Sequence, residues 1–402
     1  MEILRAYKVE LDPNDAQRTA FAQHAGASRW AYNWGLSKKI ETYKVTKKSP
    51  NAIELHKELN ALKKTAPEDG GVPWMYEVSK CAPQEALRDL DKAFQGFFLR
   101  CKKGSGKKGF PKFKSRHRSP RKFRLTGTIR VSEDGRKLKL PNLGWLRLKE
   151  IDYLPGPDQE DIEIQSASVS ERAGRWFVSL GCMQTIPDPP LRPRAKVVGV
   201  DVGINSLAVT SDGLVFENPK ALARMQRRLR QAQKALARKQ KGSRNRQKAR
   251  EKVARVHYRV FCIRRDSLQK ATSEIVKSAD IIGVETLNVS GMLKNHKLAR
   301  SLSDASMSEF LRQIRYKAEW AGVEVIEADR FFPSSKTCSC CGQVKKDLSL
   351  RERVYECECG LKINRDLNAA INLRDMALSS RVSACGEISS GQVIRDLTKL
   401  PR

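Results

Sequence analysis

The chain has 402 residues, of which 77 are Lys or Arg and 45 are Asp or Glu, so its formal net charge is +32. This charge predicts a polyanionic partner, and nucleic acid is the first candidate. A membrane surface is the second, but no apolar run approaches the roughly 18 residues of a spanning helix, and from the strand-like N-terminus we expect no signal peptide. A basic protein of the ribosomal kind remains an alternative, and the length allows two or three domains.

Residues 2–11 alternate as a strand does, and a mostly helical block follows to about residue 100. Its first helix begins near Asn14 and carries SRWAYNWGL, and its last covers QEALRDLDKAFQGFFLR. We expect their aromatic residues, among them Trp30, Trp34 and Phe94, to lie in a core rather than to stack on bases.

Residues 102–124 change character, because they contain eleven Lys or Arg and no acid. Glycines and prolines exclude a long helix there. We interpret this segment as a strap that binds a nucleic-acid backbone, with Phe110 and Phe113 either packing or stacking on bases.

Strand patterns return over 125–185, with turns at Asp134-Gly135 and near Ala173-Gly174. They predict a small β-barrel or sandwich that the N-terminal strand completes, so that the helical block is an insertion. The proline-rich segment 186–195 is interpreted as a linker.

A further domain begins with a buried strand over 197–202 and two short strands. Two long basic helices follow between Pro219 and Lys277, with a break near Gly242-Ser243. Residues 220–265 hold eighteen Lys or Arg and one acid, Glu251, whereas a merely solvated helix face mixes both signs. The pattern therefore favours contact with phosphates.

The remaining pattern is a buried strand in ADIIGVETL, a helix from about Ser303 to Ala321, a strand in VEVIEA, and a cysteine-rich segment. Four of the ten cysteines have the spacing of zinc ligands: Cys338, Cys341, Cys357 and Cys359. Four thiolates suit a structural Zn²⁺ with no open position for water. The second pair is closer than usual, so Cys340 remains an alternative to Cys341. The other cysteines are scattered, which fits a reducing cytosol.

Three carboxylates stand where strands end or a helix begins. Asp201 lies in VVGVDVGI, Glu285 follows IIGV, and Asp366 opens DLNAAINLRDMAL. With a β-β-β-α-β-α-β-α order, they match the ribonuclease H arrangement, whose acids hold two divalent metals at one sheet edge. Mg²⁺ prefers oxygen ligands, and two ions can support phosphodiester hydrolysis that leaves a 5′ phosphate and a 3′ hydroxyl. An acid that only caps a helix or accepts hydrogen bonds remains the alternative.

Several stretches are shared with a known family: GVDVGI, the run from GVETLNV to KAEWAG, FPSSKTCSCCG, YECECGLKINRDLNAAINL, and, earlier, YKVELDPNDAQ, GFPKFK and LKLPNLGWLRL. In these stretches the chain resembles TnpB, a family of transposon-encoded, RNA-guided DNA endonucleases related to the ancestors of type V CRISPR effectors. The resemblance covers about residues 3–378.

The resemblance implies an α/β multidomain fold, with a wedge β-barrel, an inserted helical recognition domain, and a ribonuclease H-like (RuvC) nuclease domain that carries a zinc-ribbon insertion. The implied ranges are 1–12 for the first barrel strand, 13–117 for the recognition domain, 118–190 for the barrel, 191–335 for the first part of RuvC with a basic hairpin at 219–278, 336–363 for the zinc ribbon, 364–378 for the final RuvC helix, and 379–402 for a tail without regular structure.

The resemblance also implies roles for residues and partners. Asp201, Glu285 and Asp366 match the RuvC acids, which hold two catalytic Mg²⁺ ions, and the four thiols hold one Zn²⁺. Lys80 and Gln84, and more loosely Thr126, match positions that read a short motif beside the target; a structural role is their alternative. The implied partners are a guide RNA from the transposon end and double-stranded target DNA, bound by a protein monomer in the prokaryotic cytoplasm.

Two positions depart from the family. Asn364 stands where relatives often have Asp, and Gln269-Lys270 where they often have His-Lys. The triad itself is intact, so we predict an endonuclease that cuts both DNA strands with one site. A transposase that uses the same acids, and an RNA-guided regulator that binds without cutting, remain the alternatives; strand-transfer products would identify the first, and loss of a triad acid is the signature of the second.

Overall fold

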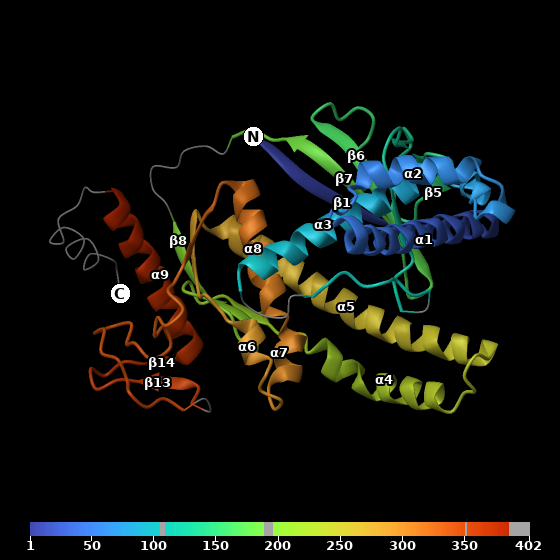
Figure 1. The fold of residues 1–402 in the computed structure, drawn as a ribbon. Helices are drawn as coiled ribbons and strands as arrows, with labels where there is room; N and C mark the ends of the chain where they lie inside the picture. The colour runs from blue at the N-terminus through green and yellow to red at the C-terminus, as the bar shows by residue number, and fades with distance from the viewer. Residues whose placement is uncertain (105–108, 117, 189–195, 350–351, 386–402) are drawn as a thin grey trace. The chain divides into compact units, whose positions relative to one another are not determined.

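The computed structural model describes residues 1–104, 109–116, 118–188, 196–349 and 352–385. The chain forms two compact units, Met1–Pro187 and Asp188–Arg402 (Figure 1). Most of the expected linker at 186–195 and residues 386–402 of the expected tail lie outside the described residues.

The helices of the first unit are α1 (Asp15–Thr46), α2 (Ala52–Lys64) and α3 (Cys81–Lys102), with 3₁₀ turns at Pro67–Asp69 and Pro73–Glu77. Helix α1 begins where the sequence predicts, because Asn14 and Gln17 form a reciprocal capping box. Gly35 lets α1 approach α3 closely, since a β-carbon there would lie 2.6 Å from Leu87 Cδ2. These helices enclose a leucine-rich core.

The expected core role of the aromatic residues is confirmed for three of them. Trp30 and Trp34 stack with their ring centroids 6.0 Å apart, and both pack with Phe94 against the helical core. Phe98, in contrast, is 55% exposed.

In the described part of the 102–124 strap, Phe110 packs against two other aromatic rings while remaining 47% exposed. Its ring lies edge-to-face on Phe94 and Phe97, at 5.4 Å from each. Phe113 is 59% exposed. The Asn33 side chain receives the Lys114 amide at 2.7 Å and donates to the Lys114 carbonyl at 2.9 Å, which fixes this stretch against α1.

The strands of the first unit form two antiparallel sheets. One has the order β1-β7-β6-β2, from Glu2–Leu11, Arg175–Thr185, Ile162–Arg172 and Lys122–Leu125. The other has the order β3-β4-β5, from Arg130–Val131, Lys137–Leu140 and Gly144–Arg147. The N-terminal strand pairs with β7 along its whole length, as predicted, and both predicted turns are present, with Ala173 and Gly174 at positive φ.

The second unit is built on one mixed sheet of order β10-β9-β8-β11-β12. Its strands are β8 (Val197–Asp201), β9 (Ser206–Thr210), β10 (Val215–Glu217), β11 (Ile281–Val284) and β12 (Glu324–Glu327). The first three are antiparallel, whereas β11 runs parallel to both β8 and β12. The two strands that end at predicted acids, β8 at Asp201 and β11 before Glu285, are therefore neighbours and run in the same direction.

Helix α9 (Arg365–Cys385) lies directly against this sheet. The reason is a pair of glycines: Gly199 on β8 and Gly283 on β11 face each other in register. A β-carbon at Gly199 would collide with the Ala370 backbone, and one at Gly283 with the Leu373 carbonyl. The expected final helix ended at residue 378, but α9 continues to Cys385.

The other helices of this unit are α4 (Ala221–Ala237), α5 (Arg244–Ser278), α6 (Val289–Met292), α7 (Ala299–Ala305) and α8 (Met307–Ala321). Helices α4 and α5 pack together and are separated at the predicted break, where the Ser243 side chain caps α5. The single helix expected from Ser303 to Ala321 is wrong, because Ser306 adopts a left-handed conformation with φ 55° and divides α7 from α8.

Candidate active site and metal centre

Two of the three predicted acids are brought together by strand register. Asp201 is the last residue of β8, and Glu285 directly follows β11. Because Val200 pairs with Val284 in parallel register, the two carboxylates leave the sheet at the same level.

The third acid, Asp366, lies in the first turn of α9, the helix that packs on β8 and β11. Asn364 fixes that turn, since its side-chain oxygen accepts the amides of Asp366 at 2.9 Å and Leu367 at 3.2 Å. The Asn that departs from the family pattern is thus the cap of the helix that carries the acid.

The charges of this edge interact strongly. Burial, and then the neighbouring carboxylates of Glu285 and Asp366, raise the pKa of Asp201 well above its ordinary value, against the opposing effect of Arg365. In the described chain, however, the three acids do not form a closed cluster: only the four thiols form a group whose ligand atoms all lie within 4.8 Å of one another. The acids therefore form an open, half-buried anionic edge that could hold a cation.

The sequence did not single out Ser334, which contacts this edge. Its hydroxyl donates to a Glu285 carboxylate oxygen, and its side chain is almost completely buried. The Ser334 carbonyl accepts the Asn372 amide of α9 at 2.7 Å, and Asn372 also donates to the Thr337 carbonyl at 2.7 Å. Asn368 donates a second bond to the Thr337 carbonyl, at 2.7 Å. Two buried amides of α9 therefore hold the segment that positions Ser334.

The four predicted zinc ligands come together immediately after that segment. The sulfurs of Cys338 and Cys359, and of Cys341 and Cys357, are 3.6 Å apart. A tetrahedral site with Zn–S bonds of about 2.3 Å separates sulfurs by about 3.8 Å, so the thiols fit Zn²⁺. Cys340 is exposed and lies outside the group.

The cysteine loops are supported by a small hairpin, β13 (Val354–Glu356) with β14 (Lys362–Asn364). The fully buried Tyr355 donates from its hydroxyl to the Lys336 carbonyl at 3.1 Å. Burial opposes ionisation of Cys338, but hydrogen bonds from the Cys341 and Cys340 amides lower its pKa to about 7, which favours the thiolate that metals require.

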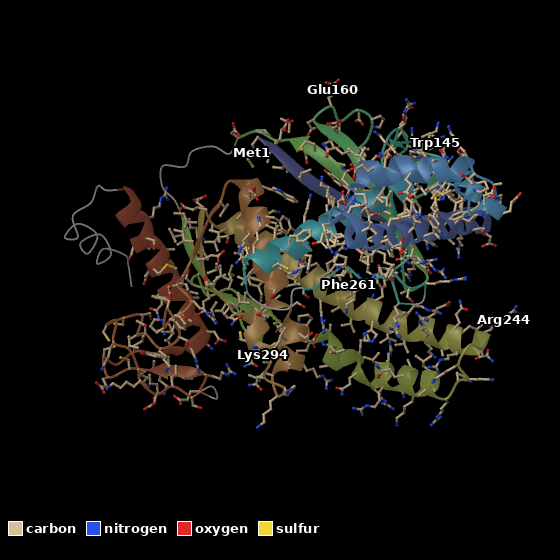
Figure 2. The ribbon with its side chains drawn as sticks, viewed as in Figure 1. Met1, Trp145, Glu160, Arg244, Phe261 and Lys294 are labelled. Atoms are coloured by element: carbon tan, nitrogen blue, oxygen red, sulfur yellow. The ribbon has the colours of Figure 1, made fainter. Side chains whose placement is uncertain are left out.

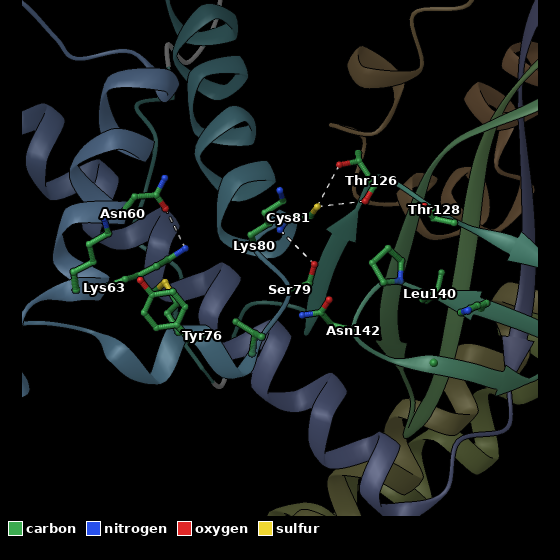
Figure 3. A pocket seen from close by; sticks show the side chains of 17 residues that line it. Asn60, Lys63, Tyr76, Ser79, Lys80, Cys81, Thr126, Thr128, Leu140 and Asn142 are labelled. Carbon is green, nitrogen blue, oxygen red and sulfur yellow. Dashed lines mark hydrogen bonds between the residues drawn. The ribbon is translucent and has the colours of Figure 1, made fainter.

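A cavity of about 1000 Å³ lies in the first unit, beside the N-terminus of α3 (Figure 3). Lys80 and Thr126, two of the three predicted motif-reading residues, line it, whereas Gln84 does not. Cys81 Sγ lies 3.3 Å from the Thr126 carbonyl and joins the two walls. Other polar lining residues that the sequence did not indicate include Asn60, Lys63, Tyr76 and Asn142.

The basic hairpin of the second unit presents its charges outwards. Figure 2 shows nitrogen-tipped side chains along α4 and α5, with Arg244 at the start of α5. Where the two helices meet, a shallow groove is lined by four cations, Arg228, Lys252, Arg255 and Arg259, together with Met225 and Val256. These helices therefore offer an extended cationic surface.

The chain matches three family profiles. Residues 181–296 match a probable transposase of the OrfB/IS605 type, residues 308–373 match the TNB domain of Cas12f1-like proteins, and residues 1–48 match a helix-turn-helix domain of OrfB/IS605 proteins. In this structure, residues 1–48 form β1 and the continuous helix α1.

The chain is also similar over nearly its full length to curated proteins. A Streptomyces pristinaespiralis protein designated an RNA-guided DNA endonuclease is 37% identical, over 96% of this chain and 92% of the relative. InsQ of Escherichia coli K12, with the same designation, is 30% identical over 98% and 97%. The solved mini-RNA-guided endonuclease CRISPR-Cas_phi3 aligns over 94% of this chain and 92% of its own, with a TM-score of 0.45 and 8% identity.

No helix among the described residues is long and apolar enough to cross a membrane.

Proposed function

The chain belongs to the TnpB family, and from this membership we propose that it is an RNA-guided, metal-dependent endonuclease that cuts both strands of target DNA. The observation that carries the proposal is that Asp201 and Glu285 leave neighbouring parallel strands at one sheet edge, and that Asp366 lies near enough to help raise the pKa of Asp201. A guide RNA from the transposon end supplies sequence specificity by base pairing, while the protein reads a short motif beside the target.

In this proposal the mixed sheet with α4, α5, α8 and α9 is a RuvC nuclease domain with ribonuclease H-like topology. Its parts are residues 191–335 and 364–378, extended here by the rest of α9, and the cysteine loops at 336–363 are its zinc-ribbon insertion. The two sheets of the first unit are the wedge barrel (1–12 and 118–190), and the helices at 13–117 are the recognition domain. The strand pairing of β1 with β7 supports this split arrangement.

The three acids fit a divalent metal site. Carboxylate oxygens are the ligands that Mg²⁺ prefers, and the repulsion that raises the pKa of Asp201 is the electrostatic condition that a bound cation relieves. Asp201, Glu285 and Asp366 would hold two Mg²⁺ ions, which supply activation of water and neutralisation of charge at the leaving 3′ oxygen. Ser334 holds the Glu285 carboxylate in place, and Asn364 fixes the helix turn of Asp366.

The remaining surfaces of the protein bind different parts of the nucleic acid. The cationic surface of α4 and α5 binds phosphates, and the zinc ribbon holds the target strand beside Asp366. Lys80 and Thr126 read the adjacent motif from the 1000 Å³ cavity. Gln84 lies about one helical turn after Lys80 on α3, and it contacts the same motif from outside the cavity.

Purification with the co-purifying RNA tests the proposal. We expect one defined RNA species that ends in a variable guide, and cleavage of a matching DNA in Mg²⁺ to 5′-phosphate and 3′-hydroxyl ends. Asp201→Ala should abolish cleavage while leaving RNA binding intact. Random cellular RNA, cleavage by the Asp201→Ala protein, or joined strand-transfer products would each contradict it.

A further inference from the structure

A second cavity in the first unit has no role in the proposed reaction. It has a volume of about 280 Å³, the space of about nine water molecules, and lies between α1, α3, β2, β6 and β7. Four cations line it: Arg29 from α1, Lys114 from the strap, and Lys122 and Arg124 from β2. We call it the serine-lined cavity, because β6 and β7 contribute Ser168, Ser170 and Ser179 to its wall.

The hydroxyl wall follows from the period-two pattern of β6. In SASVS, Ala167 and Val169 point into the core of the unit, so the serines must point to the other face. Ser168 lies opposite Ser179 in register, and this places two hydroxyls side by side. Arg124 Nε already donates to Ser168 Oγ at 3.4 Å, so the wall faces the cations.

The cations of the cavity are only partly neutralised. Of its two carboxylates, Glu85 is paired with Arg88 at 2.6 Å and lies 3.9 Å from Arg124. Asp89 attracts the strap lysine, Lys114, whose Nζ also lies 3.4 Å from the centroid of the Tyr32 ring. Arg29 has no ion-pair or hydrogen-bond partner among the described residues, apart from its helical backbone bonds.

The pKa values of two of these cations, Arg29 and Lys114, are lowered. Burial, and then the charges of Arg116 and Arg121, lower the pKa of Arg29. Burial, with Lys122 adding to it, lowers the pKa of Lys114 to about 8. Half-buried cations that repel one another are stabilised by an anion placed between them.

We propose that the serine-lined cavity binds a phosphodiester group of the bound nucleic acid, with Arg29, Lys114 and Lys122 as charged donors and the serine hydroxyls as neutral donors. A phosphodiester carries one charge and several acceptor oxygens, so it can use charged and neutral donors at once. The volume accommodates such a group with a few waters, and the excess of four cations over two carboxylates disfavours a metal ion. This inference rests on the proposed function, because that function supplies both candidate sources, the guide RNA and the target DNA.

Neutral phosphate analogues test the site directly. Single methylphosphonate linkages are scanned through the target DNA, and separately through the guide RNA, and binding is measured for the wild type, Arg29→Gln and Lys122→Gln. We expect one linkage, or two adjacent ones, at which neutralisation weakens wild-type binding about tenfold or more and weakens binding by either variant much less. We call such a linkage coupled to the substituted cation. A coupled linkage in the DNA assigns the phosphate to the target, and a coupled linkage in the RNA assigns it to the guide.

Lys112→Gln is the matched control, since Lys112 is an exposed cation of the same strap that does not line the cavity. Its effect should be the same at every linkage. In the absence of nucleic acid, Arg29→Gln should melt at the wild-type temperature or above, because it removes a repelling charge; a lower melting temperature would make Arg29 a structural residue and overturn the proposal.

The outcomes separate this inference from the function on which it rests. If the wild-type complex cuts its target but no linkage couples to Arg29 or Lys122, the cavity does not bind a phosphate and the endonuclease assignment stands. If the wild type binds neither a defined RNA nor a matching DNA, both proposals fail.

Discussion

Replacing Ser334 by Ala should impair cleavage without unfolding the protein. The lost group is the hydroxyl of Ser334, a residue that is 2% exposed, and it donates to the Glu285 carboxylate. A hydrogen bond to a charged group has a net value of about 1.5–3 kcal/mol, which corresponds to about 10- to 150-fold. Loss of a partner that orients a metal ligand has a similar effect, about 10- to 100-fold on metal affinity or rate. We therefore expect a fall of about 10- to 100-fold.

The assay is the single-turnover cleavage rate with saturating guide RNA and target, as a function of Mg²⁺ concentration. Binding of Mn²⁺ to the protein, followed by calorimetry, gives a readout independent of cleavage and should weaken in parallel. Unfolding should change little, because the bond from Asn372 to the Ser334 carbonyl does not need the hydroxyl. Ser334→Thr, which restores a hydroxyl, should recover part of the loss.

Ser335→Ala is the matched control, since the neighbouring serine meets Arg365 only at 3.4 Å and does not contact Glu285. It should cleave at close to the wild-type rate. Wild-type rate and wild-type Mg²⁺ dependence in Ser334→Ala would refute the positioning argument. Equal losses in both serine variants would point to a general disturbance of the segment instead.

Three further predictions concern metal, packing and pH. Cys357→Ser, or removal of zinc by a chelator, should lower the melting temperature and make the segment around the four thiols sensitive to protease, whereas Cys340→Ser should leave zinc content at one ion per chain. Gly199→Ala should lower the free energy of unfolding in urea by about 1–3 kcal/mol or more, because its β-carbon meets the α9 backbone. Gly96→Ala on α3 is the control and should be neutral or stabilising. Equal effects of the two substitutions would contradict the close packing of α9 on β8. Burial lowers the pKa of Lys317 to about 8, so between pH 8 and about 10.4 the unfolded chain binds more protons than the folded one. The free energy of unfolding of the wild type, relative to that of Lys317→Met, should therefore rise with pH across this range. Below pH 8 the difference should not change with pH. A difference that does not change with pH would show that Lys317 titrates normally.

The parts of the site that the sequence predicted are those with a local signal. Asp201 ends an apolar strand and Glu285 follows one, and the cysteine spacing predicted the four thiols that the structure brings together, with only Cys340 left as an alternative to Cys341. Such signals depend on neighbours along the chain, so they can be found without knowing which segments meet. The expected single helix over 303–321 had the right period, and only the left-handed conformation of Ser306 divides it.

The parts that were missed depend on contacts between distant segments. Ser334 meets Glu285 across 49 positions, and Asn372 meets Ser334 across 38. A serine and an asparagine at those positions have no periodic or spacing signal. The glycines of VVGVD and IIGVE are a partial exception, because each stands two residues before an acid. That repeated pattern could have predicted a helix packed directly on two adjacent strands.

The position of the cysteine loops in the chain has a physical consequence for the acids. The loops are inserted between β12 and α9, so their two ends must stay close to the sheet edge if Asp366 is to face Asp201. At one end, Asn364 belongs to β14 and also caps α9, so the hairpin leads directly into the helix. At the other end, Asn368 and Asn372 bond the Thr337 carbonyl, one residue before the first thiol.

The same α9 therefore holds both ends of the insertion, and one of its bonds reaches the segment that carries Ser334. Metal in the four-thiol site would order Cys338, and order at Cys338 would restrain the Thr337 carbonyl that α9 binds. We expect zinc loss to reduce the Mn²⁺ affinity of the acids as well as local stability, with Asn372→Ala reproducing the first effect while zinc remains bound. If zinc-free protein kept its full Mn²⁺ affinity, the insertion would be joined to the acids by the chain alone, and zinc binding would have no effect on metal binding by the acids.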